Sequence, residues 1–238
     1  MTFLARLTAS VAAHGPLCVG IDPHPALLDA WGGGAPVAQA ERLGRAVVAA
    51  AAGRAGVVKP QVGLFERHGP DGLRALQRVC SAATEAGLIV ITDAKRGDIG
   101  TTAKGYAAAY LANSAPFPSD AVTVNPYMGL DTLEPFLDQA EANGKGVVVL
   151  ARTSNPGSAD FQARDLEGAP LYARVVEALA PAIERLKGPE NWSSLMLVAG
   201  ATGPEEARHL RRLAPDALFL VPGYGAQGGG AADALAGF

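Results

Sequence analysis

The stretch ITDAKRGDIGTT, residues 91–102, joins the end of an apolar strand to a group of alternating charges. Side chains alternate between the two faces of a strand, so Asp93 and Lys95 point to the same face. In parallel α/β proteins, the carboxyl end of a strand is the end that carries active sites. The spacing therefore predicts a lysine that its neighbours keep charged and that can act as an acid. An exposed, salt-bridged turn is the simpler interpretation of Asp-x-Lys taken alone.

Short apolar runs alternate with alanine- and leucine-rich stretches along the chain. Strands are expected at residues 17–22, 56–62, 88–95, 121–127, 146–152, 195–200 and 218–223. Helices are expected at residues 39–53, 70–86, 100–112, 130–143, 169–187 and 203–213. The alternation predicts parallel pairing with right-handed crossovers, and strands that are apolar throughout indicate a sheet covered on both faces.

This alternation fits both an open doubly wound sheet and a closed barrel. Polar residues follow nearly every expected strand, at Asp22, Lys59, Asp93 with Lys95, Asn125, 152–155, Thr202 and Gln227. Residues from so many strands meet at one point only if the sheet closes, whereas an open sheet gathers ligands at one switch point. The sequence therefore predicts an α/β fold of the (β/α)8 TIM-barrel type, as a single domain over residues 1–238.

The composition excludes several classes of protein. The 238 residues are 49% hydrophobic and carry a net charge of −3, so no basic surface for nucleic acid is expected. No apolar run reaches the ~18 residues of a membrane-spanning helix. Residues 1–15 resemble a signal peptide only weakly, because Arg6 interrupts their apolar part. They are interpreted as an amphipathic helix, and the protein is expected to be cytoplasmic.

Neither a disulfide nor a metal site is expected. Cys18 and Cys80 lie in a predicted strand and a predicted helix, where buried free thiols are the better interpretation. The histidines are scattered, without the spacing of a zinc site, at His14, His24, His68 and His209.

The pattern D-x-K-x-x-D-I-G-x-T at 93–102, with TSNPG at 153–157 and PGYGAQGG at 222–229, resembles the signature of the orotidine 5′-phosphate decarboxylases. The likeness extends from about residue 17 to residue 229 and is greatest to the bacterial branch with longer chains. It implies decarboxylation of orotidine 5′-phosphate to UMP and CO2, the last step of de novo UMP synthesis. It also implies a homodimer that uses neither a metal nor an organic cofactor.

The resemblance also implies an eighth strand after the PGYGAQGG loop, with an arginine near its end that helps to hold the substrate phosphate. Nothing in the sequence matches that segment, and without it the first and seventh strands would expose hydrogen-bonding edges. We therefore expect a barrel without its C-terminal eighth strand and last helix. A chain that stops short of its natural end is favoured over a barrel that closes differently.

The family's catalytic residues map onto an alternating chain of charges, Lys59, Asp93, Lys95 and Asp98. Loss of CO2 leaves negative charge on C6 of the pyrimidine, so a fixed ammonium both stabilises that charge and supplies a proton. The resemblance implies that Lys95 is this donor. Asp93 would keep Lys95 charged and lie near the departing carboxylate. Without the resemblance, Lys59 could equally be a surface lysine at the end of a strand.

The family also implies residues that bind the ribose. Asp22 would bind a ribose hydroxyl, although alone it could simply cap the next segment. In the family, the last aspartate of the charged chain enters from the neighbouring subunit. Asp98, Ile99 and Thr102 would accordingly serve the partner's active site, with Asp98 and Thr102 near the ribose hydroxyls.

The remaining expected contacts hold the base and the phosphate. By resemblance, Ser154 lies over the pyrimidine, and the glycine-rich loop 223–230 grips the phosphate through its backbone, with Gly223 and Gln227 as contacts. A flexible tail is the simpler interpretation of that loop. Residues 157–168 are polar without clear periodicity, and they are interpreted as a lid over the nucleotide.

Two other functions remain open. A relative in the same superfamily that decarboxylates a keto-sugar phosphate would need magnesium held by an acidic residue on the second strand, where this chain has Lys59. A nucleotide-binding protein without turnover would bind UMP tightly and form no product.

Overall fold

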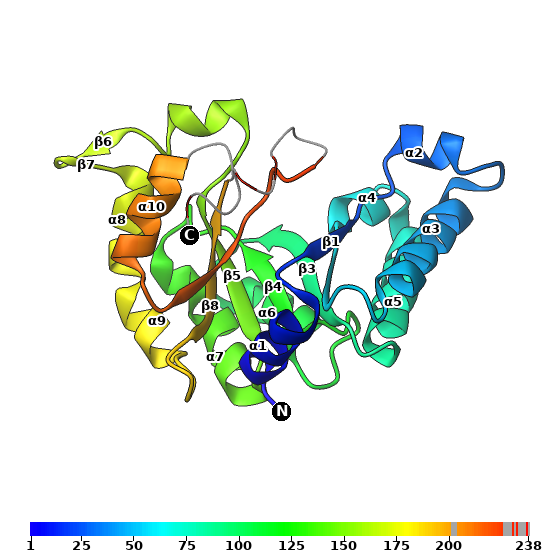
Figure 1. Cartoon of the computed structure of the whole chain (residues 1–238), viewed down its shortest axis with the longest axis horizontal. Coiled ribbons are helices and arrows are strands. Elements are labelled where there is room, and N and C mark those ends of the chain that lie inside the picture. Colours follow the sequence, from blue (N-terminus) through cyan, green and yellow to red (C-terminus); the bar gives the residue numbers. More distant parts are fainter. Residues whose placement is uncertain (201–203, 226–229, 231, 233–236, 238) are drawn as a thin grey trace.

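The computed structural model describes residues 1–200, 204–225, 230, 232 and 237, and its centre is a parallel sheet (Figure 1). Within those residues, seven strands pair in the order β1-β2-β3-β4-β5-β8-β9. Every pairing in this sheet is parallel. The strands are β1 (Cys18–Ile21), β2 (Val57–Pro60), β3 (Ile89–Arg96), β4 (Ala121–Val124), β5 (Gly146–Arg152), β8 (Ser193–Ala199) and β9 (Ala217–Leu220).

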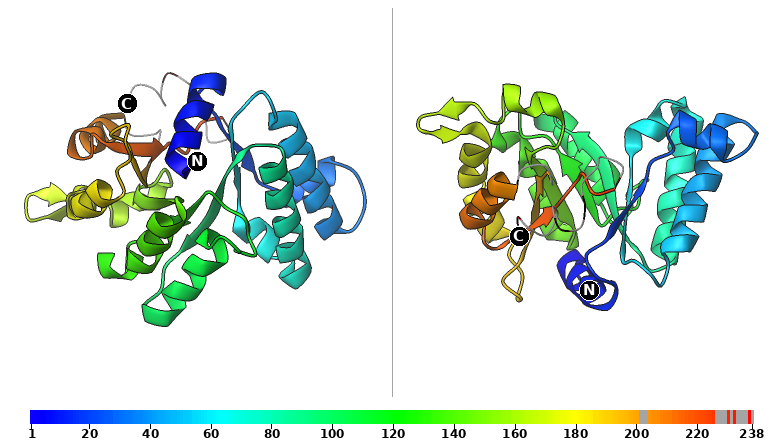
Figure 2. Two further views of the ribbon diagram at one scale, coloured as in Figure 1. Left: turned by 90° about the horizontal axis from the view of Figure 1, so that it is seen from below. Right: turned by 45° about the horizontal axis from the view of Figure 1, so that its top comes forward.

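The sheet curls into a half-barrel with helices around its outer face (Figure 2). The predicted α/β class and the positions of the seven strands are confirmed, with shifts of a few residues at their ends. β1 and β9 form the two edges of the sheet. The curl turns the carboxyl ends of the strands toward a shared space, which is where a barrel places its site.

The connections between strands are mostly helical. The α-helices are α1 (Phe3–His14), α2 (Pro25–Ala30), α3 (Pro36–Ala51), α4 (Val62–Glu66), α5 (Gly69–Glu85), α6 (Gly100–Leu111), α7 (Glu134–Asn143), α8 (Leu171–Ala178), α9 (Ala180–Arg185) and α10 (Pro204–Leu213). Two 3₁₀ helices, η1 (Leu130–Leu133) and η2 (Pro156–Asp160), precede α7 and follow β5. A small hairpin of β6 (Asp165–Leu166) and β7 (Ala169–Pro170) leads into α8.

The expected elements differ from the structure in several details. The helix expected at 169–187 is divided into α8 and α9, with Pro181 in the first turn of α9, because a proline inside a helix removes a hydrogen bond and clashes with the preceding turn. The second strand does not extend to Val62, which begins α4 and is buried at helical spacing with Phe65. The short helix α2 was not predicted, and Pro25 starts it.

Helix α1 closes the amino-terminal end of the half-barrel. Phe3 and Leu7 join the inward side chains of the strands in one apolar cluster. A Cβ at Gly146 would lie 2.4 Å from the Phe3 ring, so β5 begins with a glycine where that ring enters. Arg6 pairs with Asp120 just before β4. The predicted amphipathic helix is confirmed, and the arginine that interrupts its apolar face anchors it.

A second and larger apolar core lies between the sheet and the outer helices, around Phe65, Leu76 and Phe136. None of the helices among the described residues combines the length and the apolar composition that a membrane span requires. Both cysteines are free thiols; Cys80 in α5 is buried as expected, whereas Cys18 in β1 is only half-buried. Burial raises the pKa of the Cys80 thiol to about 12.

Candidate active site

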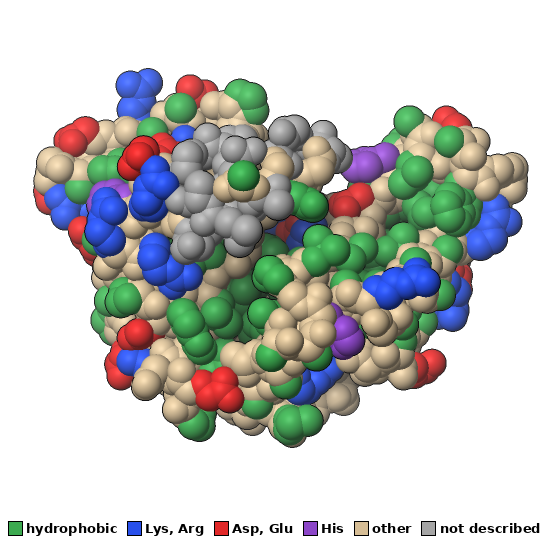
Figure 3. All heavy atoms as spheres, viewed as in Figure 1, with side chains coloured by type: hydrophobic (Ala, Val, Ile, Leu, Met, Phe, Trp, Pro, Cys, Tyr) green, Lys and Arg blue, Asp and Glu red, His purple; other side chains and the backbone are tan. Residues whose placement is uncertain are grey.

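The polar residues at the ends of β1 to β4 face one another across the mouth of the half-barrel. The register pairs Gly20 of β1 with Lys59 of β2, and an isolated bridge pairs Gln61 with Asp93 of β3. Because side chains alternate along a strand, this register turns Lys59, Gln61 and Asp93 to the same inner face. Figure 3 shows acidic and basic side chains together in the hollow at the centre of the face drawn there.

Asp93 is the centre of this cluster, and its carboxylate accepts four hydrogen bonds. Oδ2 accepts from Lys59 Nζ at 3.0 Å and from Gln61 Nε2 at 3.0 Å. Oδ1 accepts from Lys95 Nζ at 2.6 Å and from Thr123 Oγ1 at 2.9 Å. The Asp93 side chain is only 8% exposed, so these four donors hold it in one orientation.

The charges in the cluster stabilise one another. Burial raises the pKa of Asp93, but the ammonium groups of Lys59 and Lys95 outweigh burial and hold that pKa below its ordinary value. Burial lowers the pKa of Lys59, while Asp93 and Asp22 together bring it above its ordinary value. The Lys59 side chain is 18% exposed and that of Lys95 is 45% exposed. Lys95 is thus the ammonium with access to a ligand.

The backbone of Lys95 has an uncommon conformation. Its φ is +46°, in the left-handed region that residues other than glycine rarely adopt. The pairing of β3 with β4 shifts register between Thr92 and Arg96, around this residue. Such irregularities are frequent next to active sites, where they aim a side chain.

Asp22 belongs to the same cluster because its carboxylate folds back over the end of β1. A Cβ at Gly20 would lie only 2.2 Å from Asp22 Oδ2, so glycine is needed for this approach. Gly20 pairs with Lys59, and the Asp22 charge raises the Lys59 pKa. The alternative interpretation as a helix cap is wrong for α2, whose N-cap is His24 and has no side-chain cap bond.

Asp98 and Ile99 follow β3, and Thr102 lies in the first turn of α6. Among the bonds of the described residues, the Asp98 carboxylate accepts the Ile99 N–H at 2.8 Å and pairs with neither Lys59 nor Lys95. Ile99 is 63% exposed, and Thr102 in the first turn of α6 is also exposed. Within one subunit, the predicted chain of four charges therefore reaches only from Lys59 to Lys95.

Ser154 follows β5 and packs against the end of β8. A Cβ at Gly200 would lie 3.0 Å from Ser154 Cα, so the two segments touch through a glycine. Arg152 holds this region in place: its Nε donates to Glu206 Oε2 of α10 at 2.8 Å, and its guanidinium also bonds the Ser158 hydroxyl.

The expected lid at 157–168 is more regular than the sequence indicated. It contains part of η2 and β6, and β6 and β7 form a hairpin that projects outward beyond α8, at the left of Figure 1. Gln162 makes two hydrogen bonds with Thr153, each of 2.8 Å. Its Oε1 accepts the Thr153 backbone N–H, and its Nε2 donates to the Thr153 hydroxyl. These local bonds explain why polar residues without periodicity form an ordered segment.

The glycine-rich segment follows β9. Gly223 has a φ of +112° and Gly225 a φ of +80°, which glycine adopts without strain. Gly223 is buried and Tyr224 is 54% exposed. The expected contact Gln227 and the strand-end residue Thr202 lie outside the described residues.

Sequence reasoning missed Gln61 and Thr123, which supply two of the four bonds to Asp93. A signal for each was present. Gln61 stands two residues after Lys59, on the same face, and Thr123 is the polar residue within the apolar run AVTV. Both signals become readable only when the inner face of each strand is known.

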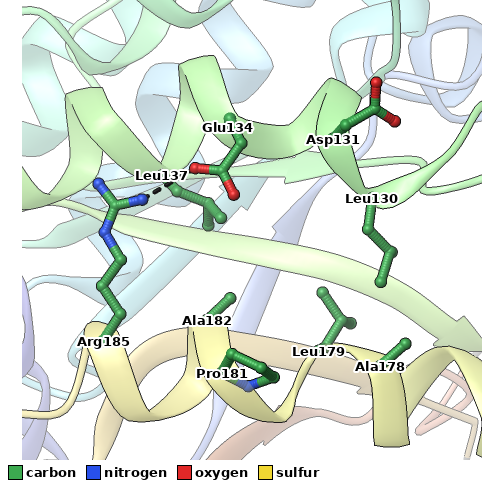
Figure 4. A pocket seen from close by; sticks show the side chains of 9 residues that line it. All are labelled: Leu130, Asp131, Glu134, Leu137, Ala178, Leu179, Pro181, Ala182 and Arg185. Atoms are coloured by element: carbon green, nitrogen blue, oxygen red, sulfur yellow. Dashed lines mark hydrogen bonds and ion pairs between the residues drawn. The ribbon is translucent and has the colours of Figure 1, made fainter.

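No group of histidine, cysteine or acidic residues in the described ranges could hold a metal ion. A shallow pocket of about 210 Å³ lies outside the barrel between η1–α7 and α8–α9 (Figure 4). There Arg185 pairs with Glu134 at 2.9 Å and with Asp138 at 2.7 Å. This pocket shares no residue with the strand-end cluster, which remains the candidate active site.

Comparison with known proteins gives a consistent result over nearly the whole chain. The sequence model described as "Orotidine 5'-phosphate decarboxylase / HUMPS family" matches residues 15–236. The orotidine 5′-phosphate decarboxylase of Salinispora arenicola is 46% identical over 98% of this chain and 82% of its own length. That of Nocardioides sp. is 42% identical over 97% of this chain and 84% of its own length.

Solved structures agree with these sequence matches. A putative orotidine 5′-phosphate decarboxylase from Streptomyces avermitilis has a TM-score of 0.90 and 41% identity, covering 100% of this chain and 82% of its own. A putative orotidine-monophosphate-decarboxylase from Toxoplasma gondii has a TM-score of 0.85 and 34% identity, covering 98% of this chain and 83% of its own. The chain therefore belongs to the orotidine 5′-phosphate decarboxylase / HUMPS family.

Proposed function

We propose that this protein decarboxylates orotidine 5′-phosphate to UMP and CO2, as the last step of de novo UMP synthesis. The observation that carries the proposal is the arrangement of Lys59 and Lys95 on opposite oxygens of the buried Asp93 carboxylate. Family membership supplies the reaction, and this arrangement supplies groups suited to it. The proposed reaction uses no metal and no organic cofactor.

The chemical difficulty of the reaction is the negative charge that develops on C6 of the pyrimidine when CO2 leaves. A fixed ammonium stabilises this charge as it develops and then donates a proton to the same atom. Lys95 suits this role because its side chain is 45% exposed while its Nζ is fixed 2.6 Å from Asp93 Oδ1. In the proposed mechanism, a proton passes from Lys95 Nζ to C6 as the C6–carboxylate bond breaks.

Asp93 and Lys59 prepare Lys95 for that step. The Asp93 carboxylate accepts a hydrogen bond from the Lys95 ammonium and places negative charge near the substrate carboxylate, and this repulsion is relieved as neutral CO2 leaves. Lys59, at 18% exposure, holds the far oxygen of Asp93 and balances its charge. The cluster is therefore set in place before the substrate arrives, which avoids reorganisation during the reaction.

Substrate binding is assigned to the surrounding strand ends. In the proposal, Asp22 binds a ribose hydroxyl, Ser154 reads the pyrimidine edge, and Gly223 with Gln227 holds the phosphate. The positive φ of Gly223 supports its part, since such backbone lets N–H groups approach an anion closely. Residues 157–168, after β5, would close over the nucleotide and expel water.

We also propose that the active form is a homodimer with shared sites, in which Asp98, Ile99 and Thr102 of each subunit reach the site of the other. Two observations support this arrangement: Ile99 is exposed, and among the described residues Asp98 makes no ion pair with Lys59 or Lys95. Residues 1–238 are proposed to act as one barrel domain. The cytoplasmic location stays a prediction.

A metal-dependent keto-sugar-phosphate decarboxylase is the weaker candidate, because the second strand carries Lys59 instead of an acidic ligand. A UMP-binding protein without turnover is the other alternative. Turnover of orotidine 5′-phosphate, measured together with UMP binding, separates the three functions.

The test is the loss of orotidine 5′-phosphate absorbance in the presence of EDTA, with the wild-type chain, Lys95→Ala and Lys187→Ala. Lys187 is an ion-paired lysine of the outer layer and serves as the matched control. We expect turnover by the wild type and Lys187→Ala, and a loss of at least about 1,000-fold in kcat for Lys95→Ala with UMP binding retained. UMP binding without turnover in the wild type would contradict the proposal.

A further inference from the structure

Thr123 lies in the middle of β4 and turns its side chain toward the charged cluster. It is only 1% exposed. Its Oγ1 accepts the backbone N–H of Lys95 at 2.8 Å and donates to Asp93 Oδ1 at 2.9 Å. A hydroxyl has one proton and two lone pairs, so it makes both bonds at once. The N–H can only donate, which leaves the hydroxyl proton for the carboxylate.

The bond from Lys95 N–H holds a residue whose backbone is unfavourable. Lys95 has a φ of +46°, and a non-glycine residue keeps such a conformation only where its surroundings hold it. The β3–β4 register shifts between Thr92 and Arg96, around this residue, so a regular ladder does not define the position of Lys95. The hydroxyl of Thr123 provides a fixed acceptor there.

The two bonds of Thr123 complete a closed ring with Lys95. From the Lys95 N–H the ring passes to Thr123 Oγ1, then to Asp93 Oδ1, and returns through Lys95 Nζ at 2.6 Å. The backbone and the tip of the lysine are thus held by a single hydroxyl–carboxylate unit. Without it, the lysine would have a flexible four-carbon stem that is 45% exposed.

We propose that Thr123 is a positioning residue for the decarboxylation, holding Lys95 in the conformation that aims its ammonium at the substrate. The inference rests on the proposed function. Because Thr123 is only 1% exposed, we expect it to act through Lys95 and Asp93 and not by contact with the substrate. After loss of the Thr123 hydroxyl, the Asp93 carboxylate would keep its other three donors. The cluster would therefore persist, but with Lys95 displaced. A displacement of about 1 Å costs on the order of 100-fold in rate.

The experiment compares Thr123→Val with Thr92→Val. Thr92 is a buried threonine of β3 whose hydroxyl bonds Ser119 on the outer side of the sheet, so its replacement controls for the structural effect of the same change. We expect Thr123→Val to lose about 10- to 100-fold in kcat, with KM and UMP affinity by calorimetry unchanged. Thr123→Ser should keep most of the wild-type kcat, because the hydroxyl alone is required.

The outcomes separate this inference from the proposed function. If the wild type does not turn over orotidine 5′-phosphate, both fail. If the wild type is active and Thr123→Val has the kcat of Thr92→Val, only the role of Thr123 fails. A rise in KM, or a fall in UMP affinity, as large as the fall in kcat would also overturn the inference. Should the valine variant not fold, Thr123→Ser against Thr123→Ala makes the same comparison without added volume, and equal kcat values would refute the inference.

Discussion

Lys59 and Lys95 bind opposite oxygens of the same carboxylate, at 3.0 Å and 2.6 Å from Asp93. Lys59 is largely buried and Lys95 is half-exposed, so the two ammonium groups have different surroundings although they share an acceptor. Removing the carboxylate would therefore leave one buried cation without its partner and one cation free to move into solvent. Stability should therefore depend mainly on the pair of Asp93 with Lys59, and activity mainly on the pair of Asp93 with Lys95.

The first prediction concerns the pH dependence of stability. Asp93 has a lowered pKa in the folded protein, so its ionised form contributes stability that is present above the unfolded pKa of about 3.9 and is lost as pH falls through the folded pKa. At pH 7, Asp93→Asn should lower the free energy of unfolding by about 3 kcal/mol, mostly through Lys59, because pairing with the half-exposed Lys95 is screened.

Urea denaturation of both proteins at several pH values measures this difference. The difference should shrink as pH falls below about 4, because a protonated Asp93 and an asparagine are both uncharged. Acid effects common to both proteins cancel in the subtraction. A difference that stayed constant down to pH 2 would mean that the carboxylate charge is not what stabilises the cluster.

Much of this arrangement was predictable because the strand period alone places Asp93 and Lys95 on one face. The apolar runs also located the seven strands of the described sheet, since both faces of the sheet are covered and most residues in each run are apolar. The partners Gln61 and Thr123 were not predicted, because which face of their strands points inward depends on the register between strands. Register is a tertiary property that a single run of residues does not carry.

The folding-back of Asp22 over Gly20 was equally hidden. A glycine in a strand indicates a close approach, but the sequence does not say of what. The division between α8 and α9 could have been read from Pro181, whereas the order of residues 157–168 depends on bonds such as that between Gln162 and Thr153. Contacts made by side chains across loops leave no periodic trace in the sequence.

The second prediction tests the shared site through hybrid dimers. Lys95→Ala and Asp98→Ala should each be inactive alone, because every site then lacks one group. In a heterodimer, one site lacks both groups and the other is intact, so an equal mixture that exchanges subunits should recover about a quarter of wild-type activity. Activity is measured after exchange and again on unmixed controls. If exchange is verified by mass and no activity returns, Asp98 does not serve the neighbouring subunit.

The third prediction concerns Gly20→Ala. The added Cβ would lie 2.2 Å from Asp22 Oδ2, the mobile end of a side chain, so Asp22 should rotate away while the strand is kept. KM should rise by about tenfold or more, since a hydrogen bond to a charged group contributes about 1.5–3 kcal/mol, with little change in thermal stability. Gly33→Ala, which meets no atom within 4 Å, is the matched control. An unchanged KM would exclude Asp22 from substrate binding.

The last prediction concerns Arg152, which ties the end of β5 to Glu206 of α10 and to Ser158 in η2. The Arg152 side chain is only 15% exposed. In Arg152→Met the methionine would still pack against the barrel as the arginine stem does, but residues 153–170 should be held less firmly. We expect faster proteolysis between residues 153 and 170 and a KM raised more than kcat is lowered, because residues 157–168 are proposed to close over the bound nucleotide. Arg45→Met, which removes an exposed pair with Glu41 on α3, controls for loss of an arginine. Cleavage at the wild-type rate together with an unchanged KM would show that the hairpin is held by its own hydrogen bonds, and that Arg152 has no part in closing the site.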